Sequence, residues 1–297
     1  LDAATGQARW KFETGDSIEA APTIAAGRVF LGSSDGFFYC LDEATGKVQW
    51  KEEGLDKMLG GATVLPGPDG APDRVLFNGH DGVVRCRKIA DGAEVWSHDA
   101  GDQINGSPGL VEGRFVVFGG CASVVHILDL ADGEVKNEVV TDAEVLSWVA
   151  TVGTTVYFAN YANQLVAADA FGDKLTWVYE DRDFPFFSNP AVDEERVYIG
   201  SRDKHLHAVD RESGQGAWKF KTGSRVDGSA LVFDDAVVFG SGDGRLYALN
   251  PKDGAEIWRL DLGEGIAASP AFADGQLVIG GDDGTLFSIR GRKPEKQ

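Results

Sequence analysis

The decapeptide LDAATGQARW, residues 1–10, sets the pattern for the whole chain. It returns at residues 41–50, and five looser copies follow. The copies end at residues 10, 50, 96, 137, 177, 218 and 258, and six of these seven positions are Trp, with Asn137 as the exception. A fixed period of about 40 residues is typical of a repeat architecture, in which each unit packs on its neighbours.

Each repeat contains four short apolar runs separated by turn sequences. In the first repeat these runs are residues 17–25, 28–32, 37–41 and 48–51. Asp35-Gly36 lies between the second and third runs, and Asp-Gly between apolar runs is a strong hairpin signal. No helical period occurs between the runs. The sequence therefore predicts four antiparallel strands per repeat.

Seven such units predict an all-β, seven-bladed β-propeller built from four-stranded antiparallel blades. We expect residues 1–290 to form a single propeller domain, followed by a charged tail at 291–297. The last unit has no fourth strand of its own, so residues 7–13 are expected to close it and remove an open edge. Residues 1–6 form a complete turn motif with no strand before it, which leaves an eight-bladed parent propeller as the alternative.

Composition excludes several classes of function. The formal net charge is −19, and no basic stripe is present, which argues against nucleic acid as a partner. No apolar run is long enough for a transmembrane segment. The three cysteines, Cys40, Cys86 and Cys121, include no C-x-x-C pair, so a disulfide framework or an ordinary zinc site is not expected. Cys40 and Cys86 occupy the same repeat position and are interpreted as small packing residues.

The motif Asp-x-x-Thr-Gly-x-x-x-Trp, present at residues 2–10 and 42–50, resembles the tryptophan-docking motif of the PQQ-like repeat propellers. The resemblance covers residues 1–290. It implies that each indole packs against the neighbouring blade, where its N–H needs an acceptor. The implied docking residues are Trp10, Trp50, Trp96, Trp177, Trp218 and Trp258.

One functional class with this repeat is the quinoprotein dehydrogenases, which the resemblance implies would bind PQQ and calcium near the channel mouth. Glu19, Asn105 and Asp227 are suitable residue types for a hard cation. They fall on blades 1, 3 and 6, however, and the chain has no adjacent cysteine pair. We therefore assign no catalytic, cofactor-binding or metal residues, and the enzyme remains the alternative.

The other class is non-catalytic. It includes the lipoprotein subunit of the outer-membrane β-barrel assembly machinery and many extracytoplasmic interaction platforms. The chain has no metalloprotease, serine-hydrolase or phosphate-loop motif. We expect a monomeric, acidic, periplasmic or otherwise extracytoplasmic propeller that binds an unidentified protein partner. His205 and His207 share one strand face and could contact a metal, but a cross-strand or solvent-facing pair is the simpler interpretation.

Units four and five break the repeat with aromatic and basic residues on turns that we expect at the same end of the propeller. Aromatic and basic side chains in an acidic molecule suit a partner surface. The alternative is that the aromatics fill a blade contact widened by the loss of Trp at Asn137. The candidate partner surface consists of Tyr161, Phe184, Phe186, Phe187, Arg202 and Lys204.

Overall fold

The computed structural model describes residues 1–54, 56–67, 70–104, 106–145 and 147–291. They form two compact units, Leu1–Thr154 with Ala170–Lys174, and Thr155–Asp169 with Leu175–Gln297. Among the described residues, no helix is both long and apolar enough to cross a membrane. That residues 1–290 form a single domain stays a prediction, and the tail from residue 292 lies outside the described residues.

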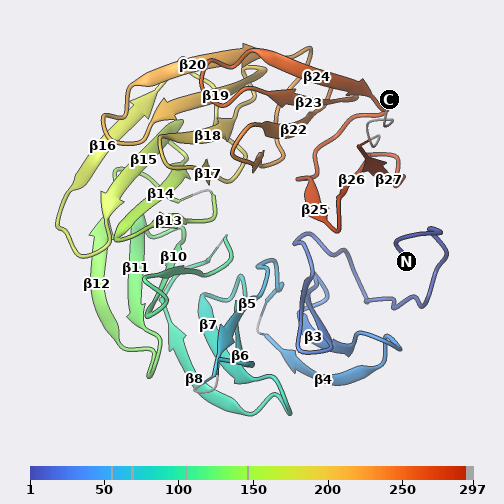
Figure 1. Ribbon diagram of the computed structural model, residues 1–297. Helices are drawn as coiled ribbons and strands as arrows, with labels where there is room; N and C mark the ends of the chain where they lie inside the picture. Colours follow the sequence, from blue (N-terminus) through green and yellow to red (C-terminus); the bar gives the residue numbers. More distant parts are fainter. Residues whose placement is uncertain (55, 68–69, 105, 146, 292–297) are drawn as a thin grey trace. The chain divides into compact units, whose positions relative to one another are not determined.

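The first unit holds three four-stranded sheets and the first strand of a fourth. In Figure 1 the strands of each of these sheets lie side by side in chain order. The strands are β1 Thr23–Ala25, β2 Arg28–Gly32, β3 Phe37–Asp42, β4 Val48–Glu53, β5 Thr63–Pro66, β6 Pro72–Asn78, β7 Val83–Lys88, β8 Glu94–Asp99, β9 Gly109–Val111, β10 Phe115–Gly119, β11 Val124–Asp129, β12 Val135–Val140 and β13 Ala150–Val152.

The second unit holds the remaining three strands of the fourth sheet, two four-stranded sheets and a final three-stranded sheet. Across the described residues the strand order confirms the all-β, seven-bladed propeller class. The strands are β14 Thr155–Asn160, β15 Gln164–Asp169, β16 Leu175–Glu180, β17 Ala191–Val192, β18 Arg196–Gly200, β19 His205–Asp210, β20 Gly216–Lys221, β21 Leu231–Val232, β22 Val237–Ser241, β23 Arg245–Leu249, β24 Glu256–Asp261, β25 Ala271–Ala273, β26 Gln276–Gly280 and β27 Leu286–Arg290.

The first strand of each blade is shorter than the sequence predicts. The run at 17–25 yields only β1, which begins directly after Pro22. Proline has no N–H to donate to a ladder, so it delays the start of a strand. Pro108, Pro190 and Pro270 stand at the same place before β9, β17 and β25.

Side-chain hydroxyls join the short first strands of successive blades. Thr23 Oγ1 donates to the Ala62 carbonyl at 2.8 Å. In the second unit the Asn189 N–H donates to Ser229 Oγ at 3.0 Å, and the Ser229 N–H donates to Ser269 Oγ at 2.9 Å. These bonds satisfy backbone groups that the truncated ladders leave unpaired.

Five tryptophans dock on the following blade, each donating an indole N–H to a backbone carbonyl. The acceptor always lies in the turn between the third and fourth strands. Three residues after the acceptor, a glycine with positive φ lies under the indole. At Gly254, φ is +71°, and an added Cβ would lie 2.7 Å from the Trp218 ring. The pairs are Trp10 with Glu43, Trp50 with Ile89, Trp96 with Leu130, Trp177 with Arg211 and Trp218 with Pro251, at 2.8–3.0 Å.

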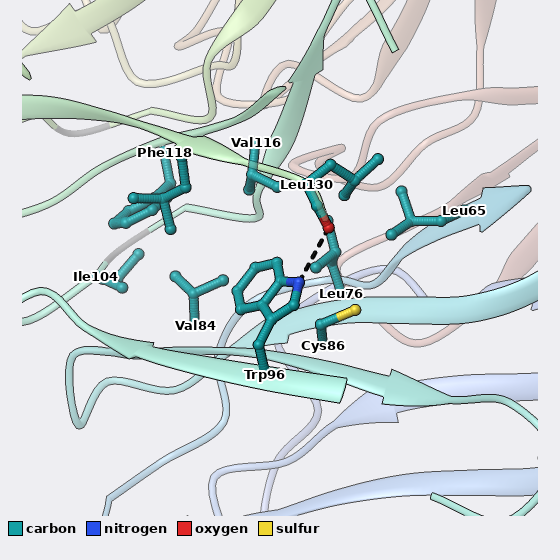
Figure 2. Close-up of a cluster of buried hydrophobic side chains, with 10 residues drawn as sticks. Leu65, Leu76, Val84, Cys86, Trp96, Ile104, Val116, Phe118 and Leu130 are labelled. Carbon is teal, nitrogen blue, oxygen red and sulfur yellow. Dashed lines mark hydrogen bonds between the residues drawn. The ribbon is translucent and has the colours of Figure 1, made fainter. Parts of the chain in front are cut away.

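Figure 2 shows the most buried of these docking contacts. The Trp96 indole points at the Leu130 carbonyl and lies among side chains of the second and third blades. Val84 and Cys86 come from its own sheet, and Val116 comes from the neighbouring sheet. The indole therefore packs against hydrophobic side chains of two sheets, and its removal would leave a cavity between them.

Cys86, and Cys40 at the same position of the first blade, are fully buried. Burial raises the pKa of each thiol to about 11. A thiol that stays protonated is a poor nucleophile and metal ligand. The interpretation of these two cysteines as packing residues is confirmed.

Asn137 is the one docking position without tryptophan. Its side-chain amide makes the hydrogen bond that an indole makes elsewhere. Its Nδ2 donates to the Ala170 carbonyl at 2.8 Å and to the Gly172 carbonyl at 3.0 Å. Ala170 occupies the same turn position as the acceptors of the tryptophans. The hydrogen bond of this blade contact is kept while the indole is lost, and Phe171 packs edge-on against Phe115 nearby, with ring centroids 4.8 Å apart.

Trp258 departs from the expected docking and is 39% exposed. It lies beside Phe272 and Ile289 in a groove along β24 and β26. No carbonyl acceptor is found for its indole among the described residues. Its ring packs in this groove, whereas the Trp218 ring lies over Gly254 of a docking turn.

The structure also corrects the expectation that residues 7–13 close the last blade. Residues 7–13 form no strand, and β27 pairs only with β26 within the described chain. Trp10 nevertheless docks on the first blade through Glu43, so the anchoring half of the motif forms. The Trp10 contact lies within one compact unit, whereas residues 7–13 and β27 belong to different units.

The turn between the second and third strands carries an aspartate that accepts a bond from the side chain four residues later. Tyr39 donates to Asp35 at 2.8 Å, and Tyr247 donates to Asp243 at 2.7 Å. These pairs lock the hairpin to its own strand. Burial first, and then the Asp35 hydrogen bond and charge, raise the pKa of Tyr39 to about 12.

We predict that Trp218→Ala lowers the free energy of unfolding by about 3–5 kcal/mol, because it removes a docked indole from between two blades. Trp258→Ala is the matched control and should cost less than about 1 kcal/mol, since its ring is exposed and undocked. Chemical denaturation of both variants measures the difference. Equal losses would show that docking contributes nothing beyond the size of the ring.

We predict that Tyr39→Phe flattens the loss of stability at alkaline pH. The folded-state pKa of Tyr39 is raised from 10.0 to about 12, so the folded state holds the proton more tightly. The stability contributed by this linkage is complete below pH 10 and is lost as the pH rises toward 12. Urea unfolding of the wild type and the variant between pH 9 and about 12 tests this, and parallel curves would contradict it.

Candidate partner-binding surface

A loop segment in the second unit is fastened to the β18–β19 turn. The Phe187 N–H donates to the Gly200 carbonyl, and the Arg202 N–H donates to the Pro185 carbonyl, both at 3.2 Å. An isolated antiparallel bridge pairs Phe186 with Ser201 between these bonds. Because side chains alternate along extended backbone, Phe186 and Phe187 point to opposite sides.

Phe186 is fully buried, which removes it from the candidate partner surface. Its ring lies 5.9 Å from Tyr179 and 5.1 Å from His207, measured between ring centroids. Tyr179 belongs to β16 and His207 to β19, so Phe186 fills the contact between the fourth and fifth blades. Phe186 therefore anchors the loop to these two blades.

Phe184 and Phe187 lie on the outer side of the loop, 46% and 38% exposed. The Arg202 guanidinium stacks on the Phe187 ring, 3.6 Å from its centroid. Arg202 Nε also lies 3.2 Å from Asp227 Oδ1. A cation over an aromatic face is favourable, and the ion pair fixes its direction. The aromatic and basic groups therefore form one ordered patch.

Lys204 is exposed in the same turn, at the position where four other blades carry glycine. Its φ is +73°, close to the +82° of Gly244 in the next blade. A side chain in this left-handed region costs about 1–2 kcal/mol relative to glycine. The turn therefore keeps a lysine in a backbone conformation that disfavours it, as residues at functional sites often do.

Tyr161 comes from a different turn, between β14 and β15, and is 56% exposed. Asn160 organises that turn by accepting bonds from the Ala162 and Gln164 N–H groups. No hydrogen bond or ring contact links Tyr161 to Phe187 or Arg202 among the described residues. The structure thus brings together Phe184, Phe187, Arg202 and Lys204 around one turn and leaves Tyr161 on a neighbouring turn of the same unit.

The alternative interpretation is that these aromatics fill the blade contact at Asn137. Other residues occupy that contact. Asn137 bonds Ala170 and Gly172, and the ring nearest to that turn is Phe171. Phe184 and Phe187 remain accessible to solvent. Only the buried Phe186 fills a contact between blades.

The side chains suggested for calcium do not fit that ion. Asp227 is held by two arginines, with Arg225 Nε at 2.9 Å and Arg202 Nε at 3.2 Å, so its charge is already neutralised. Glu19 Oε1 accepts bonds from the hydroxyls of Ser17 and Ser34. Asn105 lies outside the described residues. The donors present do not support a PQQ–calcium centre.

Sequence analysis paired His205 with His207 but missed Asp203, which joins them in a buried polar cluster. The interpretation as a solvent-facing pair is wrong for His207, whose side chain is fully buried. His207 Nε2 lies 3.2 Å from Asp203 Oδ1, and His205 Nδ1 lies 3.1 Å from Asp203 Oδ2. Burial raises the pKa of Asp203, but the His207 hydrogen bond and the two imidazoles outweigh it and lower this pKa to about 2. The signal in the sequence was the alternate spacing Asp-x-His-x-His.

We predict that Lys204→Gly raises the free energy of unfolding by about 1 kcal/mol, because it relieves a positive-φ side chain. Asn163→Gly is the matched control. Asn163 has φ of +63° at the same turn position of the fourth blade, and asparagine tolerates this region. Its gain should therefore be smaller. Denaturation curves that show no gain for Lys204→Gly would contradict the strain.

Comparison with known proteins identifies the repeat family. The family model described as outer membrane protein assembly factor BamB matches residues 1–136, 80–201, 122–258 and 202–293. These overlapping matches together cover nearly the whole chain, as expected for a repeat that can be aligned in several registers.

Two curated relatives are outer membrane protein assembly factors named BamB. The protein of Moranella endobia is 23% identical over 221 residues, which are 73% of this chain and 47% of that protein. The protein of Yersinia pestis is 28% identical over 245 residues, 78% of this chain and 60% of that one. The chain thus spans about half to three fifths of their length. A polyvinylalcohol dehydrogenase from Pseudomonas is 26% identical over 115 residues, 37% of this chain and 18% of the enzyme.

Solved structures agree on the fold. The crystal structure of BamB from Moraxella catarrhalis superposes with a TM-score of 0.78 at 21% identity, covering 97% of this chain and 88% of that one. The computationally designed Ika8 protein gives 0.67 at 16% identity, covering 93% and 97%. With the docking tryptophans and seven sheets in place, and with the family model matching from residue 1 to residue 293, the chain belongs to the BamB family of PQQ-like repeat β-propellers.

Proposed function

We propose that this chain is a non-catalytic protein-binding scaffold that acts in outer-membrane protein assembly from the periplasmic side. Family membership and the names of the curated relatives support the process and the compartment. The observation that carries the binding role is the ordered patch of Phe184, Phe187 and Arg202, to which Lys204 contributes a second cation.

The patch has the properties of an interaction site rather than of an enzyme. Two exposed aromatic rings in one short loop are a cost in water unless a partner covers them. Aromatic residues and arginine are also the side chains that contribute most to binding at protein interfaces. The backbone bonds from Phe187 to Gly200 and from Arg202 to Pro185 hold the patch in place, which lowers the entropy lost on binding.

Charge indicates what kind of partner segment fits. The chain carries a net charge of −19, yet Arg202 stacks on Phe187, Lys204 is exposed in the same turn as Arg202, and Arg225 shares Asp227 with Arg202. Asp227 pairs with two of these groups and leaves the lysine ammonium to solvent. We therefore propose a protein segment that is apolar at its centre and acidic at one flank, because such a segment meets both the rings and the cations.

The alternative of a quinoprotein dehydrogenase has weaker support. The similarity to polyvinylalcohol dehydrogenase covers 18% of that enzyme. In this chain Asp227, the carboxylate of the suggested donor set in the second unit, is paired with two arginines. We propose no redox step.

Site-specific photocrosslinking in the host tests the proposal. We predict that a photoreactive amino acid at Phe184 or Phe187 captures a specific protein of the outer-membrane assembly pathway, identified by mass spectrometry. The matched control is Phe272, an aromatic of the last blade that is 50% exposed and lies far along the chain. Capture of the same proteins from all three positions would show that the patch has no special role.

A variant pair supplies the complementary measurement. Phe184→Ser with Phe187→Ser should abolish capture of the crosslinked partner in a pull-down and leave the midpoint of thermal unfolding nearly unchanged, because both rings are exposed. Phe272→Ser should retain the partner. If the double variant keeps the partner, the patch is not the binding surface; if it unfolds, the rings belong to the core.

A further inference from the structure

The fifth blade gathers three metal-binding side chains on one face of a hairpin. Asp203 closes the β18–β19 turn, and His205 and His207 follow on β19 at alternate positions. Residues at i, i+2 and i+4 of an extended segment share one face. Each residue offers one ligand atom, and the three atoms all lie within 4.8 Å of one another.

The cluster is buried and holds a polar atom whose bonding is incomplete. The side chains of Asp203 and His207 are 1% and 0% exposed, and that of His205 is 14% exposed. Asp203 Oδ2 is buried and accepts no hydrogen bond of good geometry. His205 Nδ1 lies 3.1 Å from this oxygen and already contacts the Asp203 carbonyl oxygen at 3.0 Å. A buried carboxylate oxygen without a donor is costly unless a cation binds it.

The surroundings orient His207 as metal-ligating histidines are oriented. Its Nδ1 lies 3.1 Å from the Tyr179 hydroxyl and 3.8 Å from Asp181 Oδ2, while Nε2 faces Asp203. In metal sites the second ring nitrogen usually contacts a carboxylate, a carbonyl or another polar group, which fixes the tautomer and the direction of the ring. Both partners come from β16 and the loop after it, on the adjacent blade.

The equivalent turns of other blades explain His207 but not His205. Asp35 with Tyr39 and Asp243 with Tyr247 show that the turn aspartate ordinarily pairs with the side chain four residues later. That structural role is complete without a second imidazole. At the position of His205 the first blade has Phe37 and the sixth has Arg245, so the third donor is particular to the fifth blade.

We propose that Asp203, His205 and His207 bind a divalent transition-metal ion of the zinc class. The ligand atoms are one carboxylate oxygen of Asp203, Nδ1 of His205 and Nε2 of His207. Two imidazoles with one carboxylate suit zinc and its neighbours in the first transition row, whereas calcium and magnesium prefer oxygen donors alone. Solvent reaches the cluster at His205, where water takes the remaining position.

Bound metal would brace the turn that carries the candidate partner surface. Arg202 and Lys204 flank Asp203 directly in the chain, and Phe186 packs edge-on against His207. An ion that binds only the folded arrangement stabilises it by mass action. The metal site does not depend on the identity of any partner, so a result that refutes the proposed function would not refute the metal site.

Titration of the tag-free, full chain with Co²⁺ tests the site. The wild type should bind one ion per chain and show the visible absorption of a four-coordinate cobalt centre, and Zn²⁺ should displace it. His205→Gln should weaken binding at least about tenfold, since even loss of a supporting group has an effect of that size. Circular dichroism checks that this variant keeps its fold.

His80→Gln is the matched control, because His80 pairs with Asp56 at 3.2 Å but has no second imidazole beside it. This variant should bind Co²⁺ as the wild type does. Tyr179→Phe leaves all three ligands in place and should weaken binding without abolishing the cobalt spectrum. Absence of binding by the wild type, equal binding by His205→Gln, or loss of binding in His80→Gln each overturns the site.

Discussion

Docking at five of the tryptophans depends on one interaction, the hydrogen bond from an indole N–H to a turn carbonyl of the following blade. Each four-stranded sheet is too small to bury both of its faces, so stability comes from stacking. At Trp218 the indole donates to the Pro251 carbonyl, and Gly254 supplies the positive φ and the open space beneath the ring. The acceptor is backbone, so the turn residue that carries it is free to vary, as Glu43 and Pro251 illustrate.

Because docking uses the backbone of one turn, the fifth blade can depart from the repeat sequence at another turn and still dock on its neighbours. Trp177 docks on it through Arg211, and its own Trp218 docks on the sixth blade. Both contacts lie at the turn between the third and fourth strands. The β18–β19 turn, which bears Arg202, Asp203 and Lys204, lies at the other end of the third strand. Substitutions there leave the docking untouched, so this turn can carry binding residues.

The periodic parts of the fold could be predicted because they follow from local sequence. The Asp-Gly turns and the docking motif gave the strand count and most strand bounds. The prediction of a closing strand at residues 7–13 was wrong, because pairing between distant parts of the chain depends on long-range geometry that no local motif encodes. At the candidate surface, sequence analysis placed Phe186 on the exposed side, whereas the structure buries it. Only the bridge to Ser201 shows which side of the loop faces inward.

The fourth blade shows that the docking residue and its glycine act as one unit. The position held by Gly46 and Gly254 elsewhere is Asp173 in this turn, and the facing residue is Asn137 in place of tryptophan. An indole approaches that position so closely that a Cβ would lie 2.5–2.9 Å from the ring at Gly46, Gly92 and Gly254. A turn with Asp173 therefore has no room for it. Asn137 is shorter, still reaches the Ala170 carbonyl, and keeps the hydrogen bond without the stacking. The hydrogen bond thus has the looser requirement of the two, since an amide can replace an indole as its donor, whereas the apolar stacking needs tryptophan and glycine together.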